Sequence, residues 1–475
     1  MPSLGEARLR HAQYFFTTLR RIDALYRQGG NNITLSVALW KQERLQIAAG
    51  QDWAAQHIRA DEVVADLCSN FASFGAQLLT RQHPQERITW FQAGLDAARR
   101  LGHPILEARH LSNLGNSHLE WGNHDLAIEL SKQALAIARD SGDRHTEGIA
   151  LTNIGRAYAR SGAYPLAPEF YEQSLAIDRE LGDRHNEAIG LNNLGGVHGD
   201  LENPRRSIEF RKQALAIARD IGARETEANA LNGLGNAYDD LGEYACAIES
   251  YEEALAIARD IGARDDEAIA LRGLASSSHH LGEYSRAAEF YEKALALARD
   301  IGARREEAVI LAGCGAVYLH LGEPQRAIEL LEQALGIARD IGDRHTEGIA
   351  LDGIAYTHAR SGAYQLAADF YEQALGISRT IGKRKGESKI LNNLAAVLAH
   401  SGAYQRAAQF YEQALAIARE TQDSESEKVI LRNRNSLKPR GPALAGTIVN
   451  TVTGIARRTV KLLETLRQLM HRTSL

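Results

Sequence analysis

The chain of 475 residues has little cysteine, few aromatic residues and no long apolar run. Its cysteines, Cys68, Cys246 and Cys314, lie far apart, which argues against a disulfide framework and favours a reducing compartment. The segment Met1 to Arg20 contains no apolar core of a signal peptide. No stretch approaches the roughly 18 apolar residues of a membrane-spanning helix. We therefore expect a soluble, cytoplasmic protein without a transmembrane segment.

Motifs of the common enzymes are also missing. The sequence has no nucleophile elbow, no metalloprotease motif, no catalytic acid pair and no phosphate-binding Gly-x-x-x-x-Gly-Lys-Ser/Thr loop. His279, His280 and His320 are candidate metal ligands, but adjacent histidines point to different sides of a helix, and no cysteine or carboxylate completes a set with ligand spacing. We therefore expect no catalysis, no cofactor and no metal site.

The net charge of −5 hides an uneven distribution. Residues 432–475 contain nine Lys or Arg and one Glu, a balance of +8, which leaves −13 on residues 1–431. We expect no nucleic-acid partner for the acidic part. Aromatic residues make up only 6% of the chain, and the many alanines and 41 glycines suit closely packed helices instead.

What the chain does have is a period of 40 residues. Two leucine stripes and a glycine stripe recur at this spacing: Leu at 111, 151, 191, 231, 271, 311, 351, 391 and 431; Leu at 135, 175, 215, 255, 295, 335, 375 and 415; Gly at 102, 142, 182, 222, 262, 302, 342 and 382. Such fixed self-similarity indicates stacked repeats. Stacked repeats form long concave binding surfaces rather than one deep pocket.

Each repeat reads as two helices. In the repeat 143–182, apolar residues recur at steps of three and four in both halves, which is the helical period. Each half ends in glycine, which terminates helices readily because the residue after the last turn favours a positive φ. Seven of eight repeats keep the mid-repeat glycine, at 122, 162, 242, 282, 322, 362 and 402.

The pattern Leu-x-x-Leu-Gly-x-x-Tyr followed by Gly-x-Tyr-x-x-Ala-x-x-x-Tyr-x-x-Ala-Leu resembles the tetratricopeptide repeat. The best match is at Leu231, Leu234, Gly235, Tyr238, Gly242, Tyr244, Ala247, Tyr251 and Ala254. The usual repeat has about 34 residues, and the longer form here is similar to that of kinesin light chains and the LGN/Pins proteins. The resemblance implies an all-α, right-handed α-solenoid of helix–turn–helix repeats that binds a peptide or protein segment in its concave groove.

The sequence predicts six regions. They are an N-terminal helical region (1–83), a half repeat (84–102), eight repeats of 40 residues (103–422), a closing helix (423–437), a linker (438–447) and a basic amphipathic helix (448–472). The N-terminal region resembles the connector that joins the ATPase module to the repeats in bacterial STAND (NB-ARC-type) ATPases. Because the phosphate-binding loop is absent, this resemblance implies a sensor arm that works with a separate ATPase.

Residues repeated in every unit are expected to serve the fold, whereas function is expected where repeats differ. Arg139 and Arg144 with Glu147, and their equivalents 40 residues apart, therefore indicate charge pairing at the repeat turns rather than a ligand ladder. In tetratricopeptide arrays the first helix of each repeat lines the concave wall. Asparagine offers both donors and an acceptor there, so a row of asparagines can bind a peptide backbone without selecting its side chains.

The candidate peptide-binding residues are therefore the variable polar residues of the first helices. They are Asn113, Asn153, Asn192, Asn193, Asn232, Asn236, Asn392, Asn393, Arg156, Arg160, Asp239, Asp240 and Arg272. Glycine takes the place of the asparagine at 233, 273, 313 and 353. The alternative interpretation is a solvated helix face without a binding role.

Two segments depart from the pattern. In repeat 183–222, Glu202 replaces the turn glycine and Arg211 replaces the packing tyrosine, which predicts either a hinge or simple drift. The apolar heptad of residues 448–469 is flanked by basic residues, and it predicts one of three things: packing on the last repeat, docking into an acidic groove with possible self-association, or a membrane-surface anchor. The sequence thus favours a protein-interaction scaffold or adaptor, with the sensor arm of a STAND-type regulator as the alternative.

Overall fold

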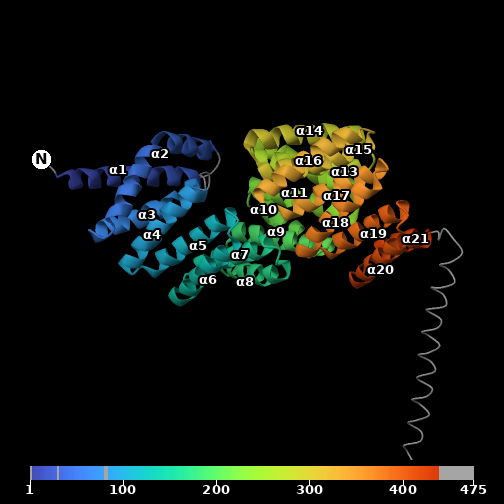
Figure 1. Ribbon diagram of the computed structural model, residues 1–475. Helices are drawn as coiled ribbons and strands as arrows, with labels where there is room; N and C mark the ends of the chain where they lie inside the picture. The colour runs from blue at the N-terminus through green and yellow to red at the C-terminus, as the bar shows by residue number, and fades with distance from the viewer. Residues whose placement is uncertain (1–2, 29–30, 80–83, 438–475) are drawn as a thin grey trace, which may run out of the picture. The chain divides into compact units, whose positions relative to one another are not determined.

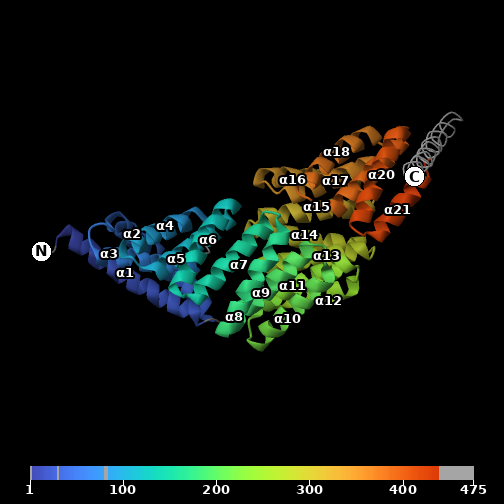
Figure 2. The same cartoon turned by 90° about the horizontal axis from the view of Figure 1, so that it is seen from below.

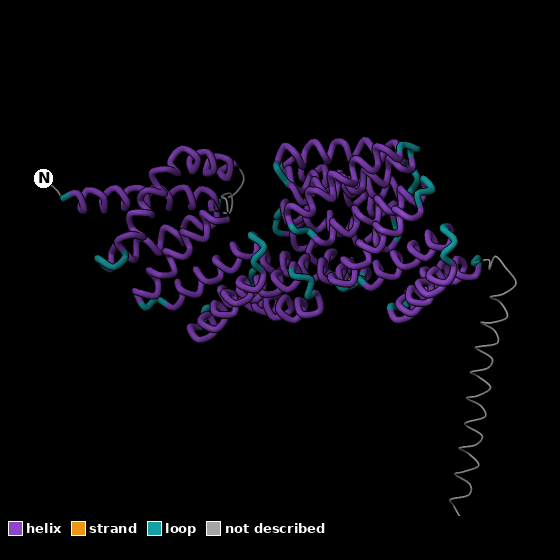
Figure 3. The backbone as a smooth tube through the Cα atoms, viewed as in Figure 1, coloured by secondary structure: helices purple, strands orange, loops and turns teal. Residues whose placement is uncertain are grey.

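The computed structural model describes residues 3–28, 31–79 and 84–437 (Figure 1). Within these ranges the chain forms 21 α-helices and one short 3-10 helix, and no strand (Figure 3). The prediction of an all-α solenoid of paired helices is therefore confirmed. No helix among the described residues is both long and apolar enough to cross a membrane. The predicted linker 438–447 and basic helix 448–472 lie outside the described residues.

The helices fall into three groups by their place in the sequence. The N-terminal region contains α1 (Leu4–Arg27), α2 (Asn31–His57) and α3 (Glu62–Leu79). The first helices of the repeats are α5 (Pro104–Glu120), α7 (Arg144–Arg160), α9 (Arg184–Asp200), α11 (Arg224–Leu241), α13 (Arg264–His280), α15 (Arg304–His320), α17 (Arg344–Arg360) and α19 (Arg384–His400), followed by α21 (Ser424–Asn435). The second helices are α4 (Pro84–Leu101), α6 (His124–Ser141), α8 (Ala167–Leu181, after the 3-10 turn Tyr164–Leu166), α10 (Pro204–Asp220), α12 (Tyr244–Ile261), α14 (Tyr284–Ile301), α16 (Pro324–Ile341), α18 (Tyr364–Thr380) and α20 (Tyr404–Glu420).

The turns between helices follow from the repeated glycines. Gly142 ends α6 with φ +70°, and the backbone N–H of Asp143 donates to the carbonyl of Ala138, which closes the helix end. The Asp143 side chain then accepts a hydrogen bond from the Thr146 N–H at the start of α7. Where the glycine is missing, Glu202 and Gln422 adopt the same positive φ, at 58° and 55°.

The chain divides into two compact bodies, Met1–Glu283 and Tyr284–Leu475. In the N-terminal body, an aromatic group of Trp40 on α2, Phe71 on α3 and Trp90 on α4 joins the N-terminal region to the repeats. In the C-terminal body, the core runs continuously from Leu311 through Tyr371 to Ile430 on α21. Within each body a helix packs on the next helix, and the first helices of the repeats also pack on one another, so first helices lie side by side (Figure 2).

A glycine-lined slot recurs where the second helix of one repeat packs against first helices. Tyr251 on α12 fits between Gly235 on α11 and Gly273 on α13, because a Cβ at either glycine would overlap with the tyrosine ring. Leu331 occupies the equivalent slot between Gly315 and Gly353. We call this the second-helix slot. Glycines 233, 273, 313 and 353 face the residue in the slot, and a Cβ at any of them would lie closer than 3.0 Å to that residue.

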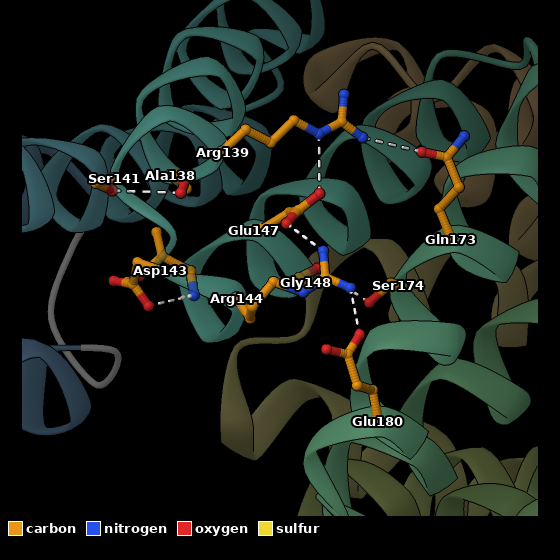
Figure 4. A network of polar contacts seen from close by, with 11 residues as sticks. Ala138, Arg139, Ser141, Asp143, Arg144, Glu147, Gly148, Gln173, Ser174 and Glu180 are labelled. Atoms are coloured by element: carbon orange, nitrogen blue, oxygen red, sulfur yellow. Dashed lines mark hydrogen bonds and ion pairs between the residues drawn. The ribbon is translucent and has the colours of Figure 1, made fainter.

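The repeated arginines and glutamates form charge clamps at the turns (Figure 4). Glu147 is only 5% exposed and binds two arginines, Arg139 Nε at 2.8 Å and Arg144 Nη1 at 2.5 Å. Burial alone would raise the pKa of Glu147, but the hydrogen bonds from Arg139 and Arg144 outweigh it and hold the pKa below 4.5. Arg139 and Arg144 also reach Gln173 and Glu180 in the next second helix. The clamps therefore join successive repeats, which fits the structural role expected from their repetition.

Candidate polar groove on the first helices

The candidate residues lie on first helices that contact one another within each body. In the N-terminal body, α5, α7, α9, α11 and α13 follow one another side by side (Figure 2). The candidate residues fall into three groups. Some bind a neighbouring helix, some lie near the second-helix slot, and some belong to a cluster of ionisable groups on α9–α13.

Two of the asparagines are structural ties. Asn153 is 5% exposed, and its Nδ2 donates to the carbonyl and the hydroxyl of Ser112 on α5, both at 3.1 Å. Asn232 is 4% exposed, and its Nδ2 donates to the carbonyl of Asp266 on α13 at 3.3 Å. These amides are engaged between helices, so the binding surface proposed below omits them.

In the C-terminal body the asparagines at the last repeat also bind each other. Asn392 Nδ2 donates to Asn393 Oδ1 at 3.4 Å, and Asn392 Oδ1 accepts from Asn433 on α21 at 3.0 Å. This chain of amides ties α19 to the closing helix. On α5, Asn113 is partly buried, and its backbone carbonyl accepts from the Ser117 hydroxyl.

A second group of candidate residues is exposed or only partly buried on the first helices. Arg156 Nη1 donates to Asn116 Oδ1 at 2.8 Å across α7 and α5, and Arg160 is exposed at the end of α7. Asn236 is exposed on α11, and its Oδ1 accepts a 2.7 Å hydrogen bond from the Tyr251 hydroxyl. Asn193 is partly buried on α9. These side chains keep polar atoms at the surface of the first helices.

The ionisable cluster centres on Asp239 of α11. Asp239 Oδ1 accepts a 2.7 Å hydrogen bond from the Ser277 hydroxyl on α13. Burial raises the pKa of Asp239 to about 6, and the neighbouring Asp240 carboxylate adds to the rise, while Ser277 and Arg272 oppose it. The cluster therefore holds an acid that titrates near neutral pH. Perturbed titratable groups of this kind are enriched at functional sites.

The sequence did not predict that Arg211 and Ser277 join this cluster. Arg211 lies in the second-helix slot of its repeat, and its Nη1 donates to Asn192 Oδ1 at 3.1 Å. A signal was present, because an arginine stands where the other repeats have an uncharged residue, usually tyrosine as at Tyr171 and Tyr251, with glycines at 195 and 233. Ser277 carries no such signal, since serine is common on helices.

The histidines that suggested a metal site pack on aromatic rings. His280 stacks on Tyr244 with centroids 4.9 Å apart, and His320 stacks on Tyr284 at 4.7 Å. His198 and His358 stack on phenylalanines in the same way. Among the described residues, no group of three or more His, Cys, Asp or Glu side chains has the arrangement of a metal site.

The comparisons with known proteins agree with this architecture. The tetratricopeptide repeat model matches in overlapping windows, at residues 106–180, 146–220, 186–260, 226–300, 266–340, 306–380 and 346–420. The chain therefore belongs to the tetratricopeptide repeat family, as its sequence motif predicted. No curated protein matches it by sequence.

Several solved structures share the fold. A STAND protein with a tetratricopeptide repeat sensor from Pyrococcus horikoshii is 16% identical, with a TM-score of 0.52 over 77% of this chain and 55% of the other. The chain thus spans about half of that protein's length. A Rap protein complexed with competence and sporulation factor is 14% identical (TM-score 0.56; 76% and 99% covered), and the apo quorum sensor NprR from B. thuringiensis is 13% identical (TM-score 0.53; 74% and 97% covered).

Proposed function

We propose that the chain is a non-enzymatic interaction scaffold that binds an extended peptide or protein segment on the first helices of its N-terminal body. The binding surface consists of Asn192, Asn193, Asn236, Asp239, Asp240 and Arg272, with Arg156 and Arg160 at one end. We call this surface the polar groove. The observation that carries the proposal is the gathering of perturbed ionisable groups and asparagines on three successive first helices, α9, α11 and α13.

The chemistry of the groove fits a peptide main chain. Carboxamides and carboxylates together present donors and acceptors to both the N–H and the C=O groups of an extended segment. The family supports the same use, because stacked repeats build long binding surfaces. The Rap structure was solved with competence and sporulation factor, which supports binding of small signals by this type of array.

A selection from a display library of 12-residue peptides on the full chain tests the proposal. We expect selected peptides to bind the double variant Asn193→Ala, Asn236→Ala about tenfold more weakly, because two lost hydrogen bonds of about 0.5–1.5 kcal/mol each sum to roughly 1–3 kcal/mol, which is a factor of about five or more. The matched control is Gln133→Ala, Gln213→Ala, which removes two exposed carboxamides from the second helices α6 and α10. Equal affinities for both double variants, measured by fluorescence anisotropy, would place the site elsewhere.

The alternative function is the sensor arm of a STAND-type regulator. The observation that favours it is the fold shared with the P. horikoshii protein, which carries a tetratricopeptide repeat sensor. In this role the same groove binds a signal, and the signal is passed to a separate ATPase. Co-purification of a nucleotide-hydrolysing protein with the full chain from native extract, lost in the groove double variant, would favour the sensor over the plain scaffold.

We place either function in the cytoplasm, supported by the three free cysteines.

A further inference from the structure

Arg211 is the exception among the residues that fill the second-helix slot. Of the seven other repeats, five have tyrosine at this position (171, 251, 291, 371 and 411), one has leucine (331) and one has serine (131). Those side chains are apolar or neutral and suit a slot between helices. Arg211 brings a positive charge into the same place, on a repeat whose neighbours keep the ordinary pattern.

The surrounding glycines fit the arginine closely. A Cβ at Gly195 on α9 would lie 2.6 Å from Arg211 Cγ, and a Cβ at Gly233 on α11 would overlap with the guanidinium Nη1. The guanidinium is thus held between two first helices, with Nη1 against Gly233 of α11 and Nη2 beside Gly196 of α9. The side chain is placed by the same packing that places Tyr251 one repeat later.

The guanidinium has fewer partners than its donors require. Nε donates to Ser207 Oγ and Nη1 donates to Asn192 Oδ1, each at 3.1 Å. Nη2 donates to no described residue, Arg211 is only partly buried, and no carboxylate among the described residues forms an ion pair with it. A guanidinium can donate five hydrogen bonds, and its fork suits a carboxylate in particular.

The residue that would cover Arg211 is missing. In the Tyr251 slot, Asn236 covers the tip of the tyrosine by accepting its hydroxyl hydrogen bond. The residue equivalent to Asn236 in the Arg211 repeat is Gly196, whose Cβ would be 3.6 Å from Nη2 in ordinary contact. In the one repeat whose slot contains a charge, position 196 therefore has no side chain to cover the guanidinium.

The local charges favour one carboxylate over a polyanion. Burial lowers the pKa of Arg211 to about 10, and the charges of Tyr251, Asp200 and Asp240 oppose that fall. A bound carboxylate would compensate the buried charge directly. Asp200 and Asp240 would repel a ligand with several negative charges, such as a phosphate or a nucleic acid, more strongly than a single carboxylate.

We propose that Arg211, with Asn192 and the opening at Gly196, forms a subsite for one carboxylate of the peptide bound in the polar groove. The carboxylate comes from an Asp or Glu side chain or from the peptide's C-terminus. This subsite rests on the proposed function and adds to it a preference for acidic peptides.

The test uses the display-selected peptides and the full chain. Each peptide is made in three forms: unchanged, with every Asp and Glu replaced by the amide residue, and with an amidated C-terminus. Affinities are measured for the wild type, for Arg211→Tyr, which restores the residue of five other slots, and for Arg205→Tyr, which removes an exposed charge from the same helix. Circular dichroism and the urea midpoint establish that Arg211→Tyr is folded.

We expect either the form without Asp and Glu or the form with an amidated C-terminus to bind the wild type at least tenfold more weakly than the unchanged peptide. The form that is weakened identifies the carboxylate that binds Arg211. Arg211→Tyr is expected to bind all three forms within about twofold of one another, whereas Arg205→Tyr keeps the wild-type preference. Groove-dependent binding with no preference for the acidic form in the wild type would overturn the subsite alone. Binding that is insensitive to Asn193→Ala, Asn236→Ala would overturn the groove itself, so the two failures are distinguishable.

Discussion

At the scale of single residues, Asp178 is the least expected side chain of the core. It is 6% exposed on α8, at a position where most repeats have alanine (138, 218, 258, 298, 338 and 418). It accepts a long hydrogen bond from Ser174, at 3.5 Å. Burial raises the pKa of Asp178 to about 6, and the nearby carboxylates of Asp183 and Glu187 contribute. The folded state therefore favours the protonated, neutral form of the Asp178 carboxyl group.

We predict that Asp178→Ala stabilises the N-terminal body at pH 7.5 by about 1–2 kcal/mol, the usual cost of a poorly paired buried polar group. The folded-state pKa lies above the unfolded value of 3.8, so the destabilisation by Asp178 is absent below the unfolded pKa, grows as pH rises from 3.8 to about 6, is partial at pH 4.5 and is complete at pH 7.5. Urea unfolding at both pH values measures the difference. Asp220→Ala, an exposed acid on α10, is the control. A gain of equal size at both pH values would mean that packing, and not ionisation, is responsible.

Residue roles were the hardest part to predict from the sequence. Position and residue type correctly placed Asn192 and Asn236 on first helices, but they could not distinguish Asn153, which ties α7 to α5, from an asparagine open to solvent. That distinction depends on whether the neighbouring helix offers an acceptor at about 3 Å. The location of the binding surface on these residues stays a prediction.

At the scale of elements, the turn after each second helix depends on a positive φ. Glycine provides it in eight turns from Gly102 to Gly382, and Gln422 provides it before the closing helix α21. A side chain in this left-handed conformation costs roughly 1 kcal/mol relative to glycine. The closing helix is thus joined to the array by the least favourable turn of the set.

We predict that Gln422→Gly increases the protection of α21 amides in hydrogen exchange by about three- to fivefold, since roughly 0.5–1 kcal/mol of strain is released at its start. The reverse substitution, Gly382→Gln, is expected to lower the protection of α19 by a similar factor, because Gly382 has φ +72°. If Gln422→Gly leaves α21 unchanged or less protected, flexibility of glycine in the unfolded chain outweighs the strain.

Helix positions were predictable because the 40-residue period repeats the same signals many times. Apolar spacing and terminal glycines predicted two helices per repeat, and the structure has them from α5 to α20. The second-helix slot was not predictable, because it depends on the distance between first helices. Gly233 and Gly273, for example, meet their slot residues Arg211 and Tyr251 only because three helices pack together.

At the scale of the whole molecule, every described contact between helices is local in sequence. A helix contacts its neighbour or the next helix but one, and the chain divides between Glu283 and Tyr284 into two compact bodies. The period predicted a stacked array but gave no sign of this division, since repeat 263–302 keeps the leucine and glycine stripes. In such arrays stability is shared between nearest neighbours.

We predict that Leu151→Ala, at a fully buried position of α7, lowers the stability of α5–α9 by about 2–5 kcal/mol. Hydrogen exchange of α17–α20 is expected to be unchanged, because the effect travels only through neighbouring repeats. Exchange measured by mass spectrometry on the full chain resolves the two segments. Leu351→Ala, the equivalent position on α17, is the control and should show the opposite pattern. Equal loss of protection in both segments would indicate one cooperative unit.

The second-helix slot has a consequence for engineering. Leu331 lies between Gly315 and Gly353, as Arg211 lies between Gly195 and Gly233, so in both repeats glycines on the two flanking first helices leave the space that the side chain fills. Each slot therefore couples the residue on a second helix to the residues on the two first helices beside it. To redesign one repeat of the array, the slot residue and its two flanking positions must be changed together as a unit.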